Sequence, residues 1–67
     1  DMRKTYYLIK RQRGERNDSL LGIVETSEEA ETVKSGLEKE KDEEESYYIA
    51  RVEVTEKGRI VVVENLW

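Results

Sequence analysis

The sequence predicts a small α+β domain with the element order β-β-α-β-β, in which a mainly antiparallel sheet carries one helix packed on one face. Three features predict this class: two β-forming runs near the start, a helix-start motif in the middle, and a hairpin pattern at the end. With 67 residues, the chain is expected to form a single domain over residues 2–67. Asp1 precedes Met2 and is set aside as a cloning remnant.

The first half of the chain predicts a β-hairpin. Residues 5–11 are rich in β-forming side chains, and residues 20–25 form a second apolar run. The polar stretch between them, residues 12–19, contains the glycine, asparagine and aspartate typical of a loop. The two runs are therefore expected to pair through a long, arginine-rich connection.

The middle of the chain predicts a helix from Ser27 to about Lys41. Thr26 and Glu29 have the spacing of a capping box, in which the two residues satisfy free N–H groups of the first turn. The apolar residues of this segment form one narrow stripe, which indicates a single packed face. They are Ala30, Val33 and Leu37.

Two further features concern the second half of this helix. Gly36 costs about 1 kcal/mol relative to alanine in a helix interior, so it either allows a close approach to the sheet or is simply tolerated. Residues 42–45 are four acids in a row, and anions at a helix C-terminus oppose the helix dipole. The helix is therefore expected to fray before it reaches them.

The end of the chain predicts a second β-hairpin. Residues 47–55 alternate in polarity, which is typical of a half-buried strand. Tyr48 and Val52 fall on one face of this strand, and Ile49 falls on the other. Residues 56–58 supply a short turn in which Gly58 can adopt a positive φ, and residues 59–66 form the return strand.

The composition excludes several classes of function. The chain has no cysteine and no histidine, which excludes thiolate nucleophiles, Ser-His-Asp triads and zinc fingers. We therefore expect neither an enzyme nor a bound cofactor or metal. The longest uninterrupted apolar run is only four residues, Ile60 to Val63, so no membrane span is expected and the cytoplasm is the expected location.

Charge is separated along the chain, although the net charge is only −4. Residues 1–16 carry six cations against two acids, whereas residues 25–45 carry ten acids against three lysines. An acidic helix ridge can occupy a cationic groove on a basic protein partner, although it can also be an ordinary solvated face. The residues expected to form such a partner-binding acidic surface are Glu38, Glu40, Glu43 and Glu44.

The basic first strand supports an alternative, a nucleic-acid-binding module. Arginines and lysines interleave with Tyr6 and Tyr7, and nucleic-acid surfaces combine such cations with aromatic side chains. The residues that would form it are Lys10, Arg11, Arg13 and Arg16. The tyrosines can equally be core residues beside cations that keep an edge strand soluble, and the acidic net charge disfavours nucleic acid.

The distribution of apolar residues predicts a homodimer. One helix with three apolar positions can cover only one face of a sheet, whereas several strands are apolar on both faces. A second copy of the chain is the simplest cover, because isologous dimers are the commonest oligomers. The residues expected on this dimer face are Ile49, Val61 and Trp67.

The segment LGIVETSEEA, residues 21–30, is followed by a helix, a tyrosine-rich strand and a terminal Trp67. This arrangement resembles small uncharacterised bacterial and phage proteins, in which a strand enters a Ser/Thr-x-Glu-Glu-Ala helix before a closing hairpin. The resemblance implies a bacterial or phage origin and carries no activity with it. The sequence thus favours a non-catalytic protein-binding module that acts through a charged surface.

Overall fold

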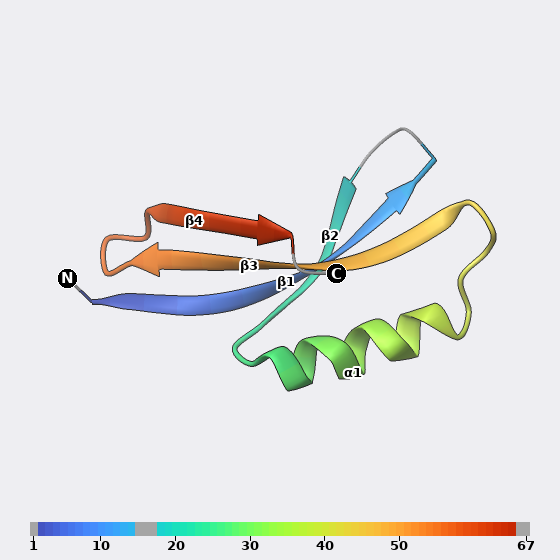
Figure 1. Cartoon of the computed structure of the whole chain (residues 1–67), viewed down its shortest axis with the longest axis horizontal. Coiled ribbons are helices and arrows are strands. Elements are labelled where there is room, and N and C mark those ends of the chain that lie inside the picture. Colours follow the sequence, from blue (N-terminus) through green and yellow to red (C-terminus); the bar gives the residue numbers. More distant parts are fainter. Residues whose placement is uncertain (1, 15–17, 66–67) are drawn as a thin grey trace.

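The computed structural model describes residues 2–14 and 18–65, which form one open sheet and one helix (Figure 1). The elements are β1 (Arg3–Arg13), β2 (Asp18–Val24), α1 (Ser27–Glu38), β3 (Glu45–Thr55) and β4 (Ile60–Asn65). The strand order is β2-β1-β3-β4, and every neighbouring pair is antiparallel. The predicted β-β-α-β-β fold class is confirmed.

The sheet is built around the central pair β1 and β3. These strands pair along their whole length, from Arg3 opposite Thr55 to Arg13 opposite Glu45. The outer strands are shorter, since β2 pairs only with residues 7–12 of β1 and β4 only with residues 50–54 of β3. The two hairpins therefore extend the sheet at opposite ends of the central pair, which gives an elongated molecule of 42 × 24 × 15 Å (Figure 1).

The connection between β1 and β2 is shorter than the sequence predicts. Both strands continue into the predicted loop of residues 12–19, where Gln12 pairs with Asp18 and Arg11 with Ser19. The reason is tertiary pairing, because β3 also hydrogen-bonds to this end of β1 and holds its polar residues in an extended conformation. Residues 15–17 lie outside the described residues.

The start of α1 follows the predicted capping motif in its Thr26 half, whereas the Glu29 side chain binds the Thr26 hydroxyl and not a backbone N–H. Thr26 is extended (φ −129°, ψ 152°), and its Oγ1 accepts a hydrogen bond from the Glu29 backbone N–H at 3.1 Å. The Glu29 side chain returns to the Thr26 hydroxyl, which donates to Oε1 at 3.0 Å. The cap therefore fixes the point at which the chain leaves β2 and turns under the sheet.

The helix ends at Glu38, three residues earlier than predicted. Lys39 is the C-cap, and the Glu40 N–H donates to the Leu37 carbonyl at 3.2 Å. The following acids do not continue the helix because they form a turn of their own, described below. Gly36 has no heavy atom within 4 Å of the position a Cβ would take, which supports tolerance over a close approach.

The core is small, and its main cluster lies where α1 crosses the central pair, while Ala50 and Val52 are buried on the opposite face of β3. Ile9 and Ile49 are opposite each other in the sheet, and both are fully buried together with Ala30 of the helix. The half-buried residues Tyr7, Val24 and Leu37 pack around them. Val33, the third member of the predicted helix stripe, is 39% exposed and lies at the margin of this contact.

Because the core is so small, truncating one of its central residues is expected to be severe. Ile49→Ala should lower the free energy of unfolding by about 2–5 kcal/mol through lost burial and a cavity. Val33→Ala, at the exposed margin, should lower it by less than about 1 kcal/mol. Urea denaturation of both variants measures the difference, and equal losses would mean that the helix does not dock as described.

Gly36→Ala is expected to have the opposite sign. The new methyl group meets open space, and alanine loses less backbone entropy than glycine on helix formation. The free energy of unfolding should therefore rise by about 0.5–1 kcal/mol. A urea midpoint that falls in this variant would show that the helix lies closer to a neighbour than the structure has it.

Candidate interaction surface

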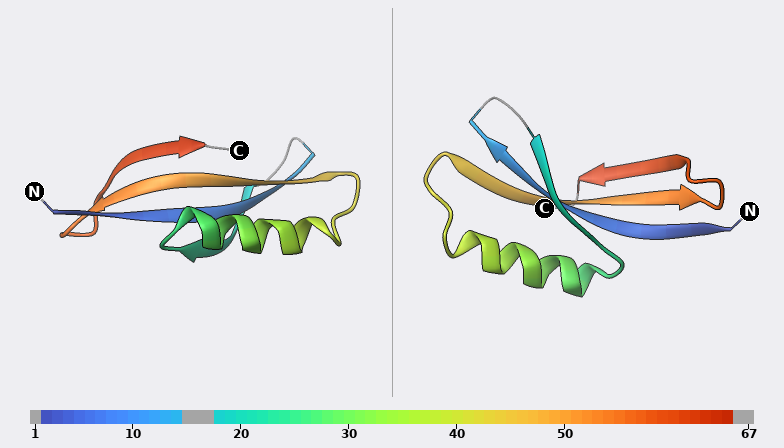
Figure 2. Two further views of the ribbon diagram at one scale, coloured as in Figure 1. Left: turned by 60° about the horizontal axis from the view of Figure 1, so that its bottom comes forward. Right: turned by 180° about the vertical axis from the view of Figure 1, so that it is seen from behind.

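The helix leaves much of the sheet uncovered on its own side. It lies under one half of the central pair and does not reach the half that bears β4 (Figure 2). There the helix-side face is mainly polar, with Val62 as an apolar exception: Arg3 Nη1 lies 3.5 Å from Glu53 Oε1, and Arg51 forms an ion pair with Glu64. This half of the helix-side face is therefore suited to contact with water.

The opposite face of the sheet, here called the open face, is apolar in its middle. By strand alternation, Tyr6 and Leu8 of β1 lie there, with Val52 of β3 between them and β4. Both outer strands contribute large apolar side chains that are more than half exposed. These are Leu20 (54%), Ile23 (58%), Ile60 (56%) and Val63 (59%).

A polar group borders the open face beside β2. Lys10 Nζ lies 6.0 Å from the ring centroid of Tyr48, its partner across the ladder. A hydrogen bond to the Asp18 carboxylate raises the pKa of Tyr48 above its ordinary value, and burial and the charge of Asp18 act in the same direction. The open face thus has an apolar centre and a defined polar margin.

The prediction that Ile49 lies on the dimer face is wrong. Ile49 is fully buried beneath α1, because its odd position in β3 directs its side chain to the helix side, and it cannot face a partner. Val61 is 40% exposed and is the extra residue of a β-bulge, between Ile60 opposite Val54 and Val62 opposite Glu53. Trp67 lies outside the described residues.

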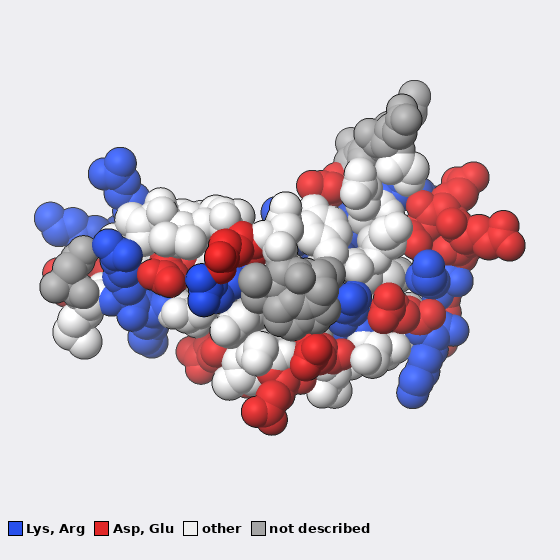
Figure 3. Space-filling view, in the orientation of Figure 1, with Lys and Arg blue, Asp and Glu red and all other residues white. Residues whose placement is uncertain are grey.

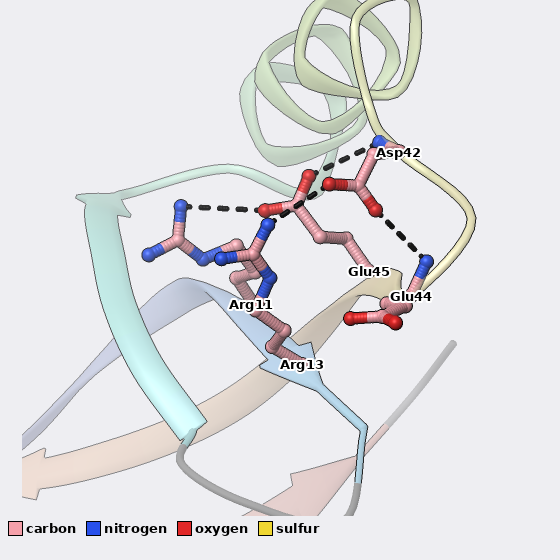
Figure 4. A network of polar contacts seen from close by, with 5 residues as sticks. All are labelled: Arg11, Arg13, Asp42, Glu44 and Glu45. Atoms are coloured by element: carbon pink, nitrogen blue, oxygen red, sulfur yellow. Dashed lines mark hydrogen bonds and ion pairs between the residues drawn. The ribbon is translucent and has the colours of Figure 1, made fainter.

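A network of polar contacts ties the α1–β3 connection to the end of β1 (Figure 4). Arg13 Nη2 lies 2.9 Å from Asp42 Oδ2, and Arg11 Nη1 lies 3.6 Å from Glu45 Oε2. Asp42 also shapes the turn, because its Oδ1 accepts the Glu44 backbone N–H at 2.9 Å. Two of the four consecutive acids therefore have arginine partners from β1.

The same contacts shift the ionisation of the Asp42–Arg13 pair. The Glu44 N–H, followed by the Arg13 side chain, lowers the pKa of Asp42 below its ordinary value. The hydrogen bond and charge of Asp42 in turn raise the pKa of Arg13. Both groups are at the surface, so the pair directs the course of the connection more than it adds stability.

The predicted acidic surface is accessible. Glu38, at the end of α1, and Glu40, Glu43 and Glu44, in the connection, are all exposed, and none forms an ion pair with another described residue. Residues 38–45 are here called the acidic end. It holds six carboxylates against Lys39 and Lys41, with Arg11 and Arg13 facing it from β1.

The cations of the predicted nucleic-acid surface that the structure describes do not lie together in one basic patch. Lys10 lies over Tyr48 on the open face, whereas Arg11 and Arg13 lie at the acidic end and face carboxylates. Arg16 lies outside the described residues. The cations of the first strand are therefore separated, and two of them are partly neutralised.

A basic patch that the sequence did not indicate lies at the other end of the molecule (Figure 3). Antiparallel pairing brings the start of β1 beside the β3–β4 turn, so that four cations gather there, with Glu53 and Glu56 as the neighbouring acids in the described part of these elements. They are Arg3, Lys4, Lys57 and Arg59, here called the basic end. A hollow of about 420 Å³, lined by Lys4, Tyr6 and Gly58 among others, opens there.

Other kinds of site find no support in the part of the chain that the structure describes. Within residues 2–14 and 18–65, no three acidic side chains are grouped so that they could hold a metal ion. No helix among the described residues has the length and apolarity needed to cross a membrane. Comparison of the chain with protein families, curated proteins and solved structures finds no match.

The lowered pKa of Asp42 predicts how the α1–β3 connection responds to acid. A carboxyl group whose pKa is lower in the folded state stabilises that state above its unfolded pKa, and the stabilisation is lost as the pH falls toward the folded pKa. Arg13→Gln should raise the pKa of Asp42 only part of the way, because the Glu44 N–H remains. A carboxyl-carbon NMR titration measures this, and an unchanged pKa would mean that Arg13 does not contact Asp42 in solution.

Proposed function

We propose that this chain is a non-catalytic protein-binding module of a bacterium or phage that acts in the cytoplasm as a homodimer. Its open face packs on a second copy, and its acidic end binds a basic protein surface. The bacterial or phage origin rests on the resemblance of residues 21–30. The binding role rests on the two surfaces described above.

The observation that carries the proposal is the contrast between the two uncovered parts of one sheet. Where the helix side is bare, its side chains are mainly paired ions, such as Arg3 with Glu53 and Arg51 with Glu64, with Val62 as an apolar exception. The open face instead holds four aliphatic side chains that are more than half exposed. Exposed aliphatic side chains on both outer strands of a chain with 42% charged residues support a surface that another protein covers.

The acidic end supports the charged component of this function. Its four exposed glutamates have no described ionic partner, while the adjacent Asp42 and Glu45 are held by arginines that fix the backbone. A charged surface on a fixed backbone suits electrostatic recognition of a basic partner. The nucleic-acid alternative has less support, because Arg11 and Arg13 face these same acids.

The homodimer is tested by light scattering after gel filtration. We expect twice the 7.9 kDa chain mass at micromolar concentration, and Ile23→Lys or Val63→Lys should shift the protein toward the monomer by burying an unpaired charge. Val33→Lys adds the same charge on the helix and should leave the dimer intact. Circular dichroism checks that each variant folds.

A mass near 7.9 kDa for the unmodified protein across the micromolar range would contradict the homodimer. A dimer that Val33→Lys disrupts and the two open-face variants do not would place the contact on the helix side instead.

A further inference from the structure

We infer that the two copies stack their open faces in antiparallel orientation, so that the acidic end of each protomer lies against the basic end of the other. This inference rests on the proposed homodimer and deepens it, because it identifies the basic surface recognised by the acidic end as part of a second copy of the chain.

The first argument is the separation of charge along the long axis. The acidic end lies at one end of the 42 Å axis and the basic end at the other (Figure 3). At the basic end, Lys4, Lys57 and Arg59 form no ion pair with another described residue. One chain thus has two complementary charged ends that are too far apart to meet within the same molecule.

The second argument is symmetry. A face-to-face isologous dimer has its two-fold axis in the plane between the sheets. If that axis runs along the long dimension, like ends stack, and acidic meets acidic. If it runs across the long dimension, the acidic end of each copy lies at the same end of the dimer as the basic end of the other. Arg11, Arg13 and Glu45 then lie on the outer, helix-side face, and the exposed glutamates of the connection are the groups that would reach the partner. Packed sheets are about 10 Å apart, which is close to the Debye length at about 0.1 M salt, so this difference is only partly screened.

The third argument is size. The two longer dimensions of the whole molecule, 42 × 24 Å, enclose about 1,000 Å² with the helix included, and a standard stable interface buries about 800 Å² on each partner. A contact that reached the required area would therefore have to extend over most of the open face, including both ends. The hollow beside Lys4 and Tyr6 also leaves room for side chains from the partner's acidic end.

Disulfide trapping tests the orientation directly, since the chain has no cysteine of its own. Glu43→Cys and Lys57→Cys each place one thiol at an exposed position, at the acidic and basic ends respectively. After the two variants are mixed and oxidised with copper phenanthroline, we expect a covalent dimer on a non-reducing gel. Glu43→Cys oxidised alone should remain unlinked, because its two thiols lie at opposite ends of the dimer.

The outcomes separate this inference from the homodimer itself. A linked dimer from Glu43→Cys alone would show that like ends stack, which overturns the orientation and leaves the homodimer standing. A protein that is dimeric by light scattering but gives no link in the mixture would also overturn the orientation. A monomer in light scattering would overturn both.

Charge reversal gives an independent readout at about 50 mM salt. Lys4→Glu with Lys57→Glu, or Glu40→Lys with Glu43→Lys, should each raise the dimer Kd about tenfold, because each creates two like-charged contacts. Mixing the two double variants should restore the affinity, since every reversed end then meets an opposite charge. If neither double variant raises the Kd, the two ends do not meet.

Discussion

A single short helix is the only layer that covers this sheet among the described residues, and most other features follow from that constraint. Twelve residues of α-helix span about 18 Å, whereas the molecule extends over 42 Å. The helix therefore shields only the region around Ile9 and Ile49 and leaves one half of its own face bare. On the open face Ala50 and Val52 are buried, but Leu20, Ile23, Ile60 and Val63 of the outer strands are more than half exposed. The bare half of the helix side is mainly ionic, with Val62 as an exception, whereas the exposed side chains of the outer strands on the open face are aliphatic.

The acidic residues after the helix, residues 42–45, both form a turn and leave exposed charges at the surface. Four like charges in sequence would repel one another in a continued helix, and the chain instead turns there. Asp42 and Glu45 use backbone N–H groups and arginines of β1 to fix that turn, which anchors the start of β3 opposite the end of β1. Glu43 and Glu44 are then left exposed on a defined backbone. The four acids therefore divide into two that fix the turn and two that remain exposed at the surface.

The sequence predicts the elements of this fold better than it predicts the surfaces. Local signals identify the Thr26 cap and the turn at Gly58, whose φ is +83°, because each depends on a few adjacent residues. Alternation correctly divides β3 into two faces, but it cannot tell which face the helix covers, and Ile49 was therefore expected at the interface. The basic end was missed for a related reason: Lys4 and Lys57 are distant in sequence and meet only through the β1–β3 ladder. The pairing of Arg13 with Asp42 likewise depends on the fold and not on any local pattern.

The small core also links stability to association. A domain of this size retains only a few kcal/mol of net stability, and the five buried apolar residues, Ile9, Ala30, Ile49, Ala50 and Val52, contribute a modest share of the apolar burial that a larger domain would have. Burial of the open face against a second copy would add apolar contacts that the single chain does not make. Because any species that binds only the folded state stabilises it by mass action, such a dimer would also raise the stability of the fold. In the proposed dimer, the separation of charge into two ends would give the association a direction. Both the uncovered apolar side chains and the proposed orientation thus follow from one short helix on a sheet whose charges are separated between its two ends.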